Sequence, residues 1–259
     1  MMSEKRLLNS WVLLRMFFRS FYIQAVWNYH SLLSIGLSYS LLPAARQIYA
    51  DKAERIKFLC RHLNFFNAHP YFASFAIGSI VRVEEEQQIR QRPDPGQVER
   101  LKNALIGPLG AIGDQVFWAN IKPSSVLVGV FGVVIFHDLQ WQLVSLLLML
   151  LMYNIPHLYV RLSGIFKGYR LGLEVYKVLN LDLYNKLKKS YAAIGAVILG
   201  SISGFSLIRF VQVDWVQGVS FMAGVILAYL IWKWRQNFYQ AVLFSLLLAF
   251  TLGIILRVL

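Results

Sequence analysis

The stretch WQLVSLLLMLLMYNIPHLYV, Trp141–Val160, contains no aspartate, glutamate, lysine or arginine. An α-helix needs about 20 mostly apolar residues to cross the hydrocarbon core of a bilayer. Only helices and closed barrels satisfy all of their backbone groups in lipid. The stretch therefore predicts a membrane-spanning helix.

Other apolar runs follow the same rule. Tyr191–Ile208 and Tyr239–Leu256 are of similar length, and Val216–Trp232 is short but uncharged. Ser124–Phe136 is too short to cross alone, and can cross only if the preceding segment supplies part of the path. We therefore predict an all-α, polytopic integral membrane protein with about four or five spans in its C-terminal part.

Composition agrees with a membrane protein. Only 15% of the 259 residues are charged and 57% are hydrophobic, whereas about a quarter of a soluble domain is charged. The net charge of +13 could indicate nucleic acid or anionic lipid. The basic residues flank apolar runs, which favours the lipid bilayer and predicts no nucleic-acid partner. The single cysteine, Cys60, excludes a disulfide within the chain.

The distribution of basic residues predicts the orientation. The connector 166–189 holds six lysines and arginines against two acidic residues, and 233–237 holds two basic residues. Basic loops stay on the cytoplasmic side. These two connectors are therefore predicted to be cytoplasmic, and His137–Asp138 and 209–215 to lie outside.

The charge density falls near Lys102, so we divide the chain by composition into 1–102 and 103–259. The first part is expected to hold amphipathic and re-entrant helices on the cytoplasmic side, and the second to hold the transmembrane helices. Leu7–Phe18 has mixed charge and helical spacing.

Two kinds of segment are expected in the first part. Within Ala50–Phe66, an apolar face recurs at steps of three and four residues, which predicts an amphipathic helix. Its members are Ile56, Leu59, Leu63 and Phe66. Ser31–Leu42 and Tyr71–Val83 are apolar runs of intermediate length, which predicts re-entrant or buried segments in place of spans.

Four blocks resemble the motifs of one known family, in order over more than half of the chain. They are WNYHSLLSIGLSYSLLPAARQIY from Trp27, RHLNFFNAHPYFASFAIGSIVRVEEE from Arg61, GPLGAIGDQVFWANIKP from Gly107, and the weaker RLSGIFKGYRLG from Arg161. The chain resembles the IID membrane component of the mannose/fructose/sorbose-type sugar phosphotransferase system.

The resemblance implies a hetero-oligomer in the bacterial inner (cytoplasmic) membrane, with a multi-pass chain. A IIC membrane subunit would pair with this chain, and the two would bind and translocate a hexose substrate. Cytoplasmic IIB and IIA components would pass phosphate to the sugar. The chain itself would be a non-catalytic subunit, with no catalytic residue, cofactor or metal site.

Three departures from the family pattern motivate an alternative. His30–Leu33 replaces a Glu-Arg-Met-Gln run, Gln115 replaces a proline, and the C-terminal third is shorter. The alternative is a degenerate scaffold or regulatory membrane subunit that does not transport.

The third block supplies the leading candidates for sugar binding. Asp114, Gln115, Trp118 and Asn120 provide a carboxylate, two amides and an aromatic face within seven residues. An ionisable group at membrane depth is costly and faces a cavity, a pore or a partner. Alternatively, Asp114 caps a helix start after Gly113. We interpret the block as a re-entrant or broken-helix element, although Gly107, Gly110 and Gly113 favour close helix packing.

Five further residues are weaker candidates for the sugar site, each with an alternative. Trp27 and Asn28 can stack on and hydrogen-bond a sugar, but a tryptophan near a membrane surface is usually an anchor. Asn67 can instead end a helix, and Glu84 and Glu85 can belong to a solvated helix end. His62 and His69 have no second ligand at metal spacing.

Overall fold

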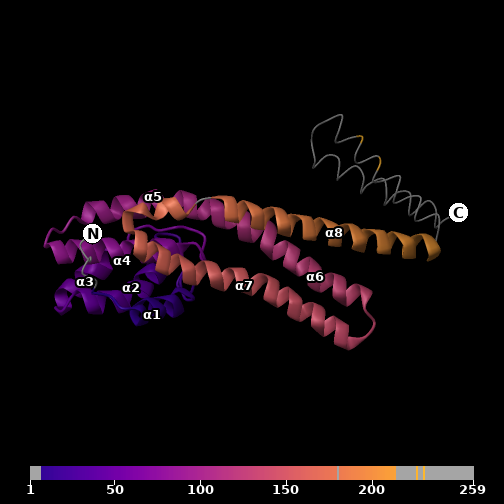
Figure 1. Cartoon of the computed structure of the whole chain (residues 1–259), viewed down its shortest axis with the longest axis horizontal. Coiled ribbons are helices and arrows are strands. Elements are labelled where there is room, and N and C mark those ends of the chain that lie inside the picture. Colours follow the sequence, from indigo (N-terminus) through magenta and orange to yellow (C-terminus); the bar gives the residue numbers. More distant parts are fainter. Residues whose placement is uncertain (1–6, 180, 214–225, 227–229, 231–259) are drawn as a thin grey trace. The chain divides into compact units, whose positions relative to one another are not determined.

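The computed structural model describes residues 7–179, 181–213, 226 and 230. Within these residues the chain is helical, with two isolated bridges and no strand. The elements are α1 Ser10–Ser20, α2 Ser34–Ile48, α3 Lys52–Arg61, α4 Ala73–Arg90, α5 Pro95–Gly113, the π-helix η1 Asp114–Ile121, α6 Lys122–Ile135, α7 Leu139–Leu171, the 3-10 helix η2 Gly172–Val178 and α8 Leu181–Val213 (Figure 1). The all-α prediction is confirmed.

The chain forms two compact units, Met1–Gly195 and Ala196–Leu259. The core, the cavity and the ion pairs described below belong to the first unit. The predicted span Tyr239–Leu256 lies outside the described residues, as does nearly all of Val216–Trp232.

Two continuous helical stretches in the described residues are long and apolar enough to cross a membrane. They are Pro95–Ile135 and Leu139–Val178, of 41 and 40 residues. The predicted span Trp141–Val160 lies inside α7, and Ser124–Phe136 is extended by the helix before it, as its short length required. Tyr191–Ile208 is helical within α8, and its crossing stays a prediction.

Segment 107–123 is not a re-entrant hairpin, because α5, η1 and α6 follow one another as one helical path (Figure 1). The interruption takes the form of a π-helix, in which backbone hydrogen bonds span five residues in place of four. Asp114 opens this π-helix instead of capping a helix start. The Asn120 side chain donates to the Gln115 carbonyl at 2.6 Å, so an amide stabilises the widened turn.

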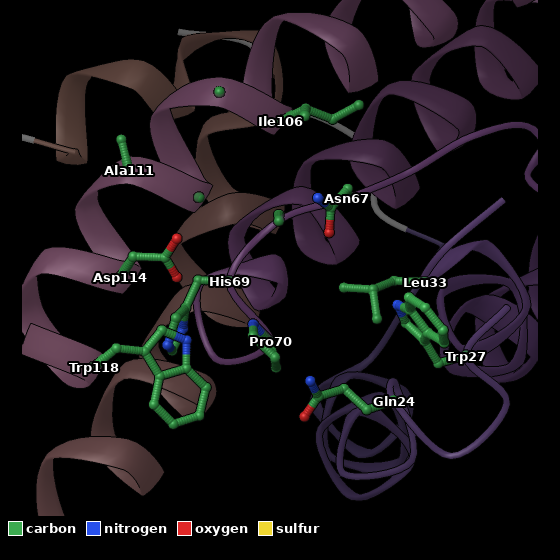
Figure 2. A pocket seen from close by; sticks show the side chains of 13 residues that line it. Gln24, Trp27, Leu33, Asn67, His69, Pro70, Ile106, Ala111, Asp114 and Trp118 are labelled. Carbon is green, nitrogen blue, oxygen red and sulfur yellow. The ribbon is translucent and has the colours of Figure 1, made fainter. Parts of the chain in front are cut away.

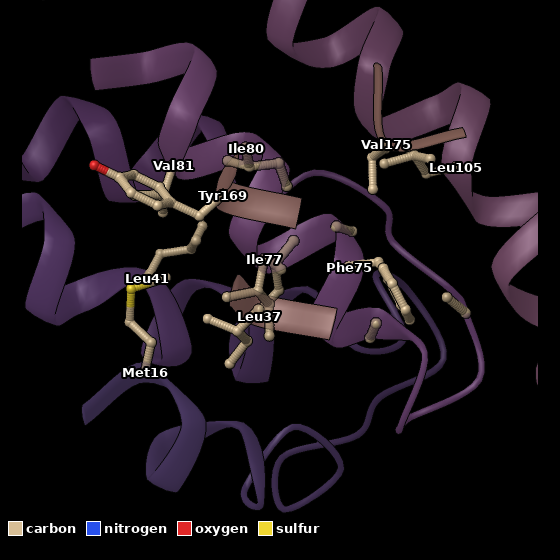
Figure 3. Close-up of a cluster of buried hydrophobic side chains, with 14 of the residues drawn as sticks. Met16, Leu37, Leu41, Phe75, Ile77, Ile80, Val81, Leu105, Tyr169 and Val175 are labelled. Carbon is tan, nitrogen blue, oxygen red and sulfur yellow. The ribbon is translucent and has the colours of Figure 1, made fainter. Parts of the chain in front are cut away.

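Helix α4 is the centre of the first unit and is buried over its first thirteen residues, as predicted for Tyr71–Val83. It packs mainly on α7. Gly78 lies against the α7 backbone at Ile165 and Tyr169, and Gly168 against the Phe75 carbonyl. Small residues let the two backbones approach closely. Figure 3 shows Phe75, Ile77 and Ile80 of α4 in the surrounding apolar core.

The predicted amphipathic helix within Ala50–Phe66 forms, and its apolar residues are divided: Phe66 is buried in the core, whereas Ile56 and Leu63 are exposed. Helix α3 begins after Asp51, whose carboxylate accepts from the Glu54 amide at 3.0 Å, and it ends at Arg61. Phe58 is its one buried residue, whereas Ile56 is 51% exposed. Arg61, the last residue of α3, donates a hydrogen bond to the buried Glu84 of α4. This pairing determines which face of α3 turns toward the core.

Candidate functional site

A cavity of about 390 Å³ lies between the third block and two loops. Asp114, Trp118 and His69 line one side, and Gln24, Trp27 and Leu33 face them across the opening (Figure 2). Asn67 and the backbone of Gly107 and Gly110 complete the polar and small-residue wall. The cavity therefore gathers one carboxylate, two amides, one imidazole and two indoles, which are groups that suit a hydroxyl-rich ligand.

The π-helical register brings residues of η1 around His69. The His69 ring stacks on Phe117 with centroids 5.3 Å apart, and lies 5.2 Å from the Trp118 ring. Gly113 leaves no room for a side chain, because a Cβ there would overlap His69. The Trp118 ring also contacts a cation, because Lys122 Nζ lies over it at 4.7 Å from the ring centroid.

His69 is buried, and burial is the main reason that its pKa falls to about 3, with smaller contributions from nearby Arg161 and His157. A charged imidazole is disfavoured where water is excluded. His69 is therefore a neutral imidazole at physiological pH, and its two ring nitrogens differ in role.

A polar aromatic layer lies behind His69. The Tyr71 ring packs 4.8 Å from Phe117 and 4.1 Å from His157, and its hydroxyl pairs with the Tyr153 hydroxyl. Arg161 is buried over the Tyr71 ring and donates to Ser20 at the end of α1. This layer fixes the loop that carries His69 between α1 and α7.

Glu84 lies outside this cavity, in a buried ionic cluster. Its carboxylate accepts from Arg61 Nε and Nη2 at 2.8 and 2.6 Å, from the Tyr49 hydroxyl at 2.9 Å, and contacts His62 Nε2 at 3.2 Å. Burial disfavours the charge, but the hydrogen bonds from His62 and Arg61 outweigh it and hold the Glu84 pKa below its usual range. The alternative of a solvated helix end is wrong for this residue, because it is fully buried.

Glu85 forms a second buried cluster. It accepts from the backbone N–H of Leu7 and Leu8 at 2.6 and 2.9 Å, and from the Tyr169 hydroxyl at 2.8 Å. Arg82 donates to it at 3.2 Å. A solvated helix end is therefore also wrong for Glu85, and a sugar contact by either glutamate stays a prediction.

Three further candidates lie outside the cavity. The side-chain oxygen Oδ1 of Asn28 accepts from the backbone N–H of His30 and Ser31, which folds a tight turn before α2. The side-chain oxygen Oε1 of Gln115 accepts from Lys188 Nζ at 2.9 Å. Asn120 donates within η1, as described above. Of the nine candidates, the structure brings four into the cavity: Trp27, Asn67, Asp114 and Trp118.

A family model described as the PTS system mannose/fructose/sorbose family IID component matches residues 8–258. The chain belongs to this family. The blocks that carried the resemblance also meet in space, because Gly78 of the second block packs against α7 beside Gly168 of the fourth.

Similar proteins of this family come from several bacteria. This IID chain is 29% identical to the PTS system mannose-specific EIID component of Escherichia coli (strain K12), over 77% of this chain and 69% of the relative. It is 28% identical to the fructose permease IID component of Bacillus subtilis (strain 168), over 78% and 71% of the two chains. The sorbose-specific EIID component of Klebsiella pneumoniae is 27% identical, over 76% and 70%.

Two solved structures share the fold. One is a chain of the mannose transporter ManYZ in complex with microcin E492, with a TM-score of 0.59. The other is described as a membrane protein, with a TM-score of 0.66. Each is 28% identical and aligns over 76% of this IID chain and 71% of its own. This IID chain is therefore an all-helical membrane protein.

Sequence reasoning missed Gln24 and His69 as wall residues. Gln24 precedes the first block, and no local pattern distinguishes it. His69 was considered only as a metal or phosphate carrier, where it lacked a partner. The adjacent Asn67 and Pro70 were the available signal, since a polar loop directly before a buried helix carries binding groups more often than the helix does.

Proposed function

We propose that this chain is the IID subunit of a mannose-type permease in the bacterial inner membrane, and that it binds and translocates a hexose together with a IIC subunit. In this proposal the cytoplasmic IIA and IIB components phosphorylate the sugar. The names of the relatives, which include mannose, fructose and sorbose, support a hexose.

The observation that carries the proposal is the polar wall of the cavity. Asp114 is exposed on a helix that is long and apolar enough to span a membrane. A carboxylate near the polar end of such a helix faces a partner, another polar group or water in place of lipid. Trp118 and Asn67 beside it offer a stacking face and an amide for hydroxyl groups. In this proposal the IIC subunit covers the open side of the cavity and completes the site, so that the two chains form a hetero-oligomer.

The depth of the cavity in the bilayer supports coupling to phosphorylation, because a site near the cytoplasmic side is accessible to cytoplasmic IIA and IIB components. Asp114 precedes Ile135 by 21 positions, or about 30 Å of helix at 1.5 Å a residue, which is about the thickness of the hydrocarbon core. If the turn at His137–Asp138 is outside, Asp114 lies near the cytoplasmic boundary. Lys188, from the basic connector that we propose to be cytoplasmic, reaches Gln115 and supports the same level.

The test measures sugar uptake and assembly separately. Asp114→Asn and Trp118→Ala should each abolish or strongly reduce uptake of the transported hexose in cells, while the chain still co-purifies with its IIC partner. If uptake persists in both variants, and falls only in Gly113→Leu through lost assembly, the chain is a scaffold and not part of the sugar path.

A further inference from the structure

One nitrogen of His69 has a fixed role inside the protein. Its Nδ1 accepts the backbone N–H of Tyr71 at 3.3 Å. A neutral imidazole that accepts at Nδ1 carries its proton on Nε2. The loop backbone thereby selects the tautomer, and Nε2–H becomes the free donor of the ring.

That donor has no acceptor among the described residues. His69 Nε2 is buried and without a hydrogen-bond partner, although the residue lines the cavity. Leaving a buried donor unpaired destabilises the folded protein, because the group loses its hydrogen bond to water. Native proteins keep few such groups, and each one points to a role such as ligand binding.

The neighbours of His69 fit a bound hydroxyl group. Asp114 is an acceptor on the same wall, and the Trp118 ring covers the imidazole on the cavity side (Figure 2). Trp118 is 40% exposed, so part of its ring is available for a sugar ring to stack on. A sugar hydroxyl can donate to a carboxylate and accept from an N–H at once, whereas a methyl group, an ion or a lipid tail cannot.

We propose that His69 is a ligand-binding residue, whose Nε2–H donates to a hydroxyl oxygen of the hexose held by Asp114. This inference rests on the proposed function and names the donor of the site. The pairing also explains why the loop fixes the ring with its proton directed away from Tyr71.

Two substitutions separate the two nitrogens. His69→Gln retains a donor near the position of Nε2, whereas His69→Asn retains only a group near the position of Nδ1 that can accept from Tyr71. Binding of radiolabelled D-mannose, D-fructose and L-sorbose is measured on the complex purified with its IIC partner. We expect His69→Asn to weaken binding roughly tenfold and His69→Gln to stay within about threefold of the natural chain.

Sugar analogues locate the hydroxyl that accepts from His69. A deoxy sugar lacks both donor and acceptor at one position, whereas a fluoro sugar retains a weak acceptor there. For one position, the natural complex should discriminate strongly against the deoxy sugar and weakly against the fluoro sugar. The His69→Asn complex should lose that discrimination. A purely structural histidine would weaken all analogues equally and would overturn the inference.

The outcomes distinguish the inference from the proposed function. If Asp114→Asn abolishes binding and His69→Asn does not change it, the inference fails and the function stands. If the natural complex binds none of the three sugars, both fail. If His69→Asn does not assemble, the 15N-labelled natural complex decides: the Nε2–H signal of His69, assigned with His69→Gln, must shift on adding the bound sugar, and an unchanged signal overturns the inference.

Discussion

Gly113 lies directly against His69, so closely that a Cβ at Gly113 would overlap the Cβ and Cγ of the histidine. Gly107 and Gly110, earlier on the same helix, have open space at the corresponding position and line the cavity. The three glycines therefore serve two purposes. Gly113 lets the loop that carries His69 pack against the helix, and Gly107 and Gly110 leave space for the cavity.

Gly113→Ala should destabilise the complex, because the methyl group must displace the His69 ring. Overpacking of this kind costs about 1–3 kcal/mol. The measurement is the melting temperature of the complex in detergent. Gly110→Ala is the matched control, since its methyl group enters open space and should leave the melting temperature unchanged. Equal melting temperatures for the two variants would contradict the contact.

Glu84→Gln should be strongly destabilising. It removes the charge of a buried carboxylate and weakens the hydrogen bonds from Tyr49, Arg61 and His62, which costs about 1–3 kcal/mol because Arg61 itself stays partly exposed. The control is Glu54→Gln, which removes an exposed ion pair with Lys57 and should change stability by less than about 1 kcal/mol. Denaturant or thermal unfolding of the two variants provides the comparison. A small effect of Glu84→Gln would mean that the hydrogen bonds between Glu84 and its neighbours contribute little to stability.

Stability should fall as the pH drops from about 7 to 5. Burial lowers the pKa of both His62 and His69 in the folded chain, whereas an unfolded histidine titrates near 6.5. Below pH 6.5 the unfolded state binds more protons, so protons favour unfolding. Each group contributes up to about 1.4 kcal/mol per pH unit in this window. The test compares melting temperatures at the two pH values, and His69→Gln should show a shallower decline. An identical decline in that variant would show that His69 does not contribute.

Gly168→Ala should separate α4 from α7. The added methyl group would meet the Phe75 carbonyl and the Ser79 amide of α4, and a backbone has less freedom to yield than a side chain. Gly200→Ala is the control, because no atom of the described residues lies within 4 Å of a Cβ at that position. Protease resistance in detergent measures the loss of packing between α4 and α7. Gly168→Ala should be cleaved faster than the natural chain, and equal resistance of the two variants would argue against close α4–α7 packing.

The sequence predicted those features that depend on local composition. The uncharged run at Trp141–Val160 required a helix, and the block around Asp114 contained five of the thirteen cavity residues. The register of the apolar face of α3 was not predictable, because it depends on Glu84, which is 23 positions from Arg61. The π-helix was missed as well, since glycine and proline around Asp114 were equally compatible with a reversal of direction.

The cavity was incomplete in the sequence for a related reason. Gln24, Trp27 and His69 lie on loops, where no periodicity indicates which side chains face inward. Their positions follow from long-range pairing, such as the Leu33 amide with the Phe66 carbonyl at 2.9 Å. Such pairs leave no local signal.

The carboxylate of Glu85 has a consequence for the order of events during synthesis. It holds the backbone of Leu7 and Leu8 together with the hydroxyl of Tyr169. Leu7 and Leu8 are translated long before Tyr169, so this three-way contact can close only after the C-terminal part of α7 has been made. The contact that joins the segment before α1, the end of α4 and the end of α7 is therefore a late event in the folding of the first unit.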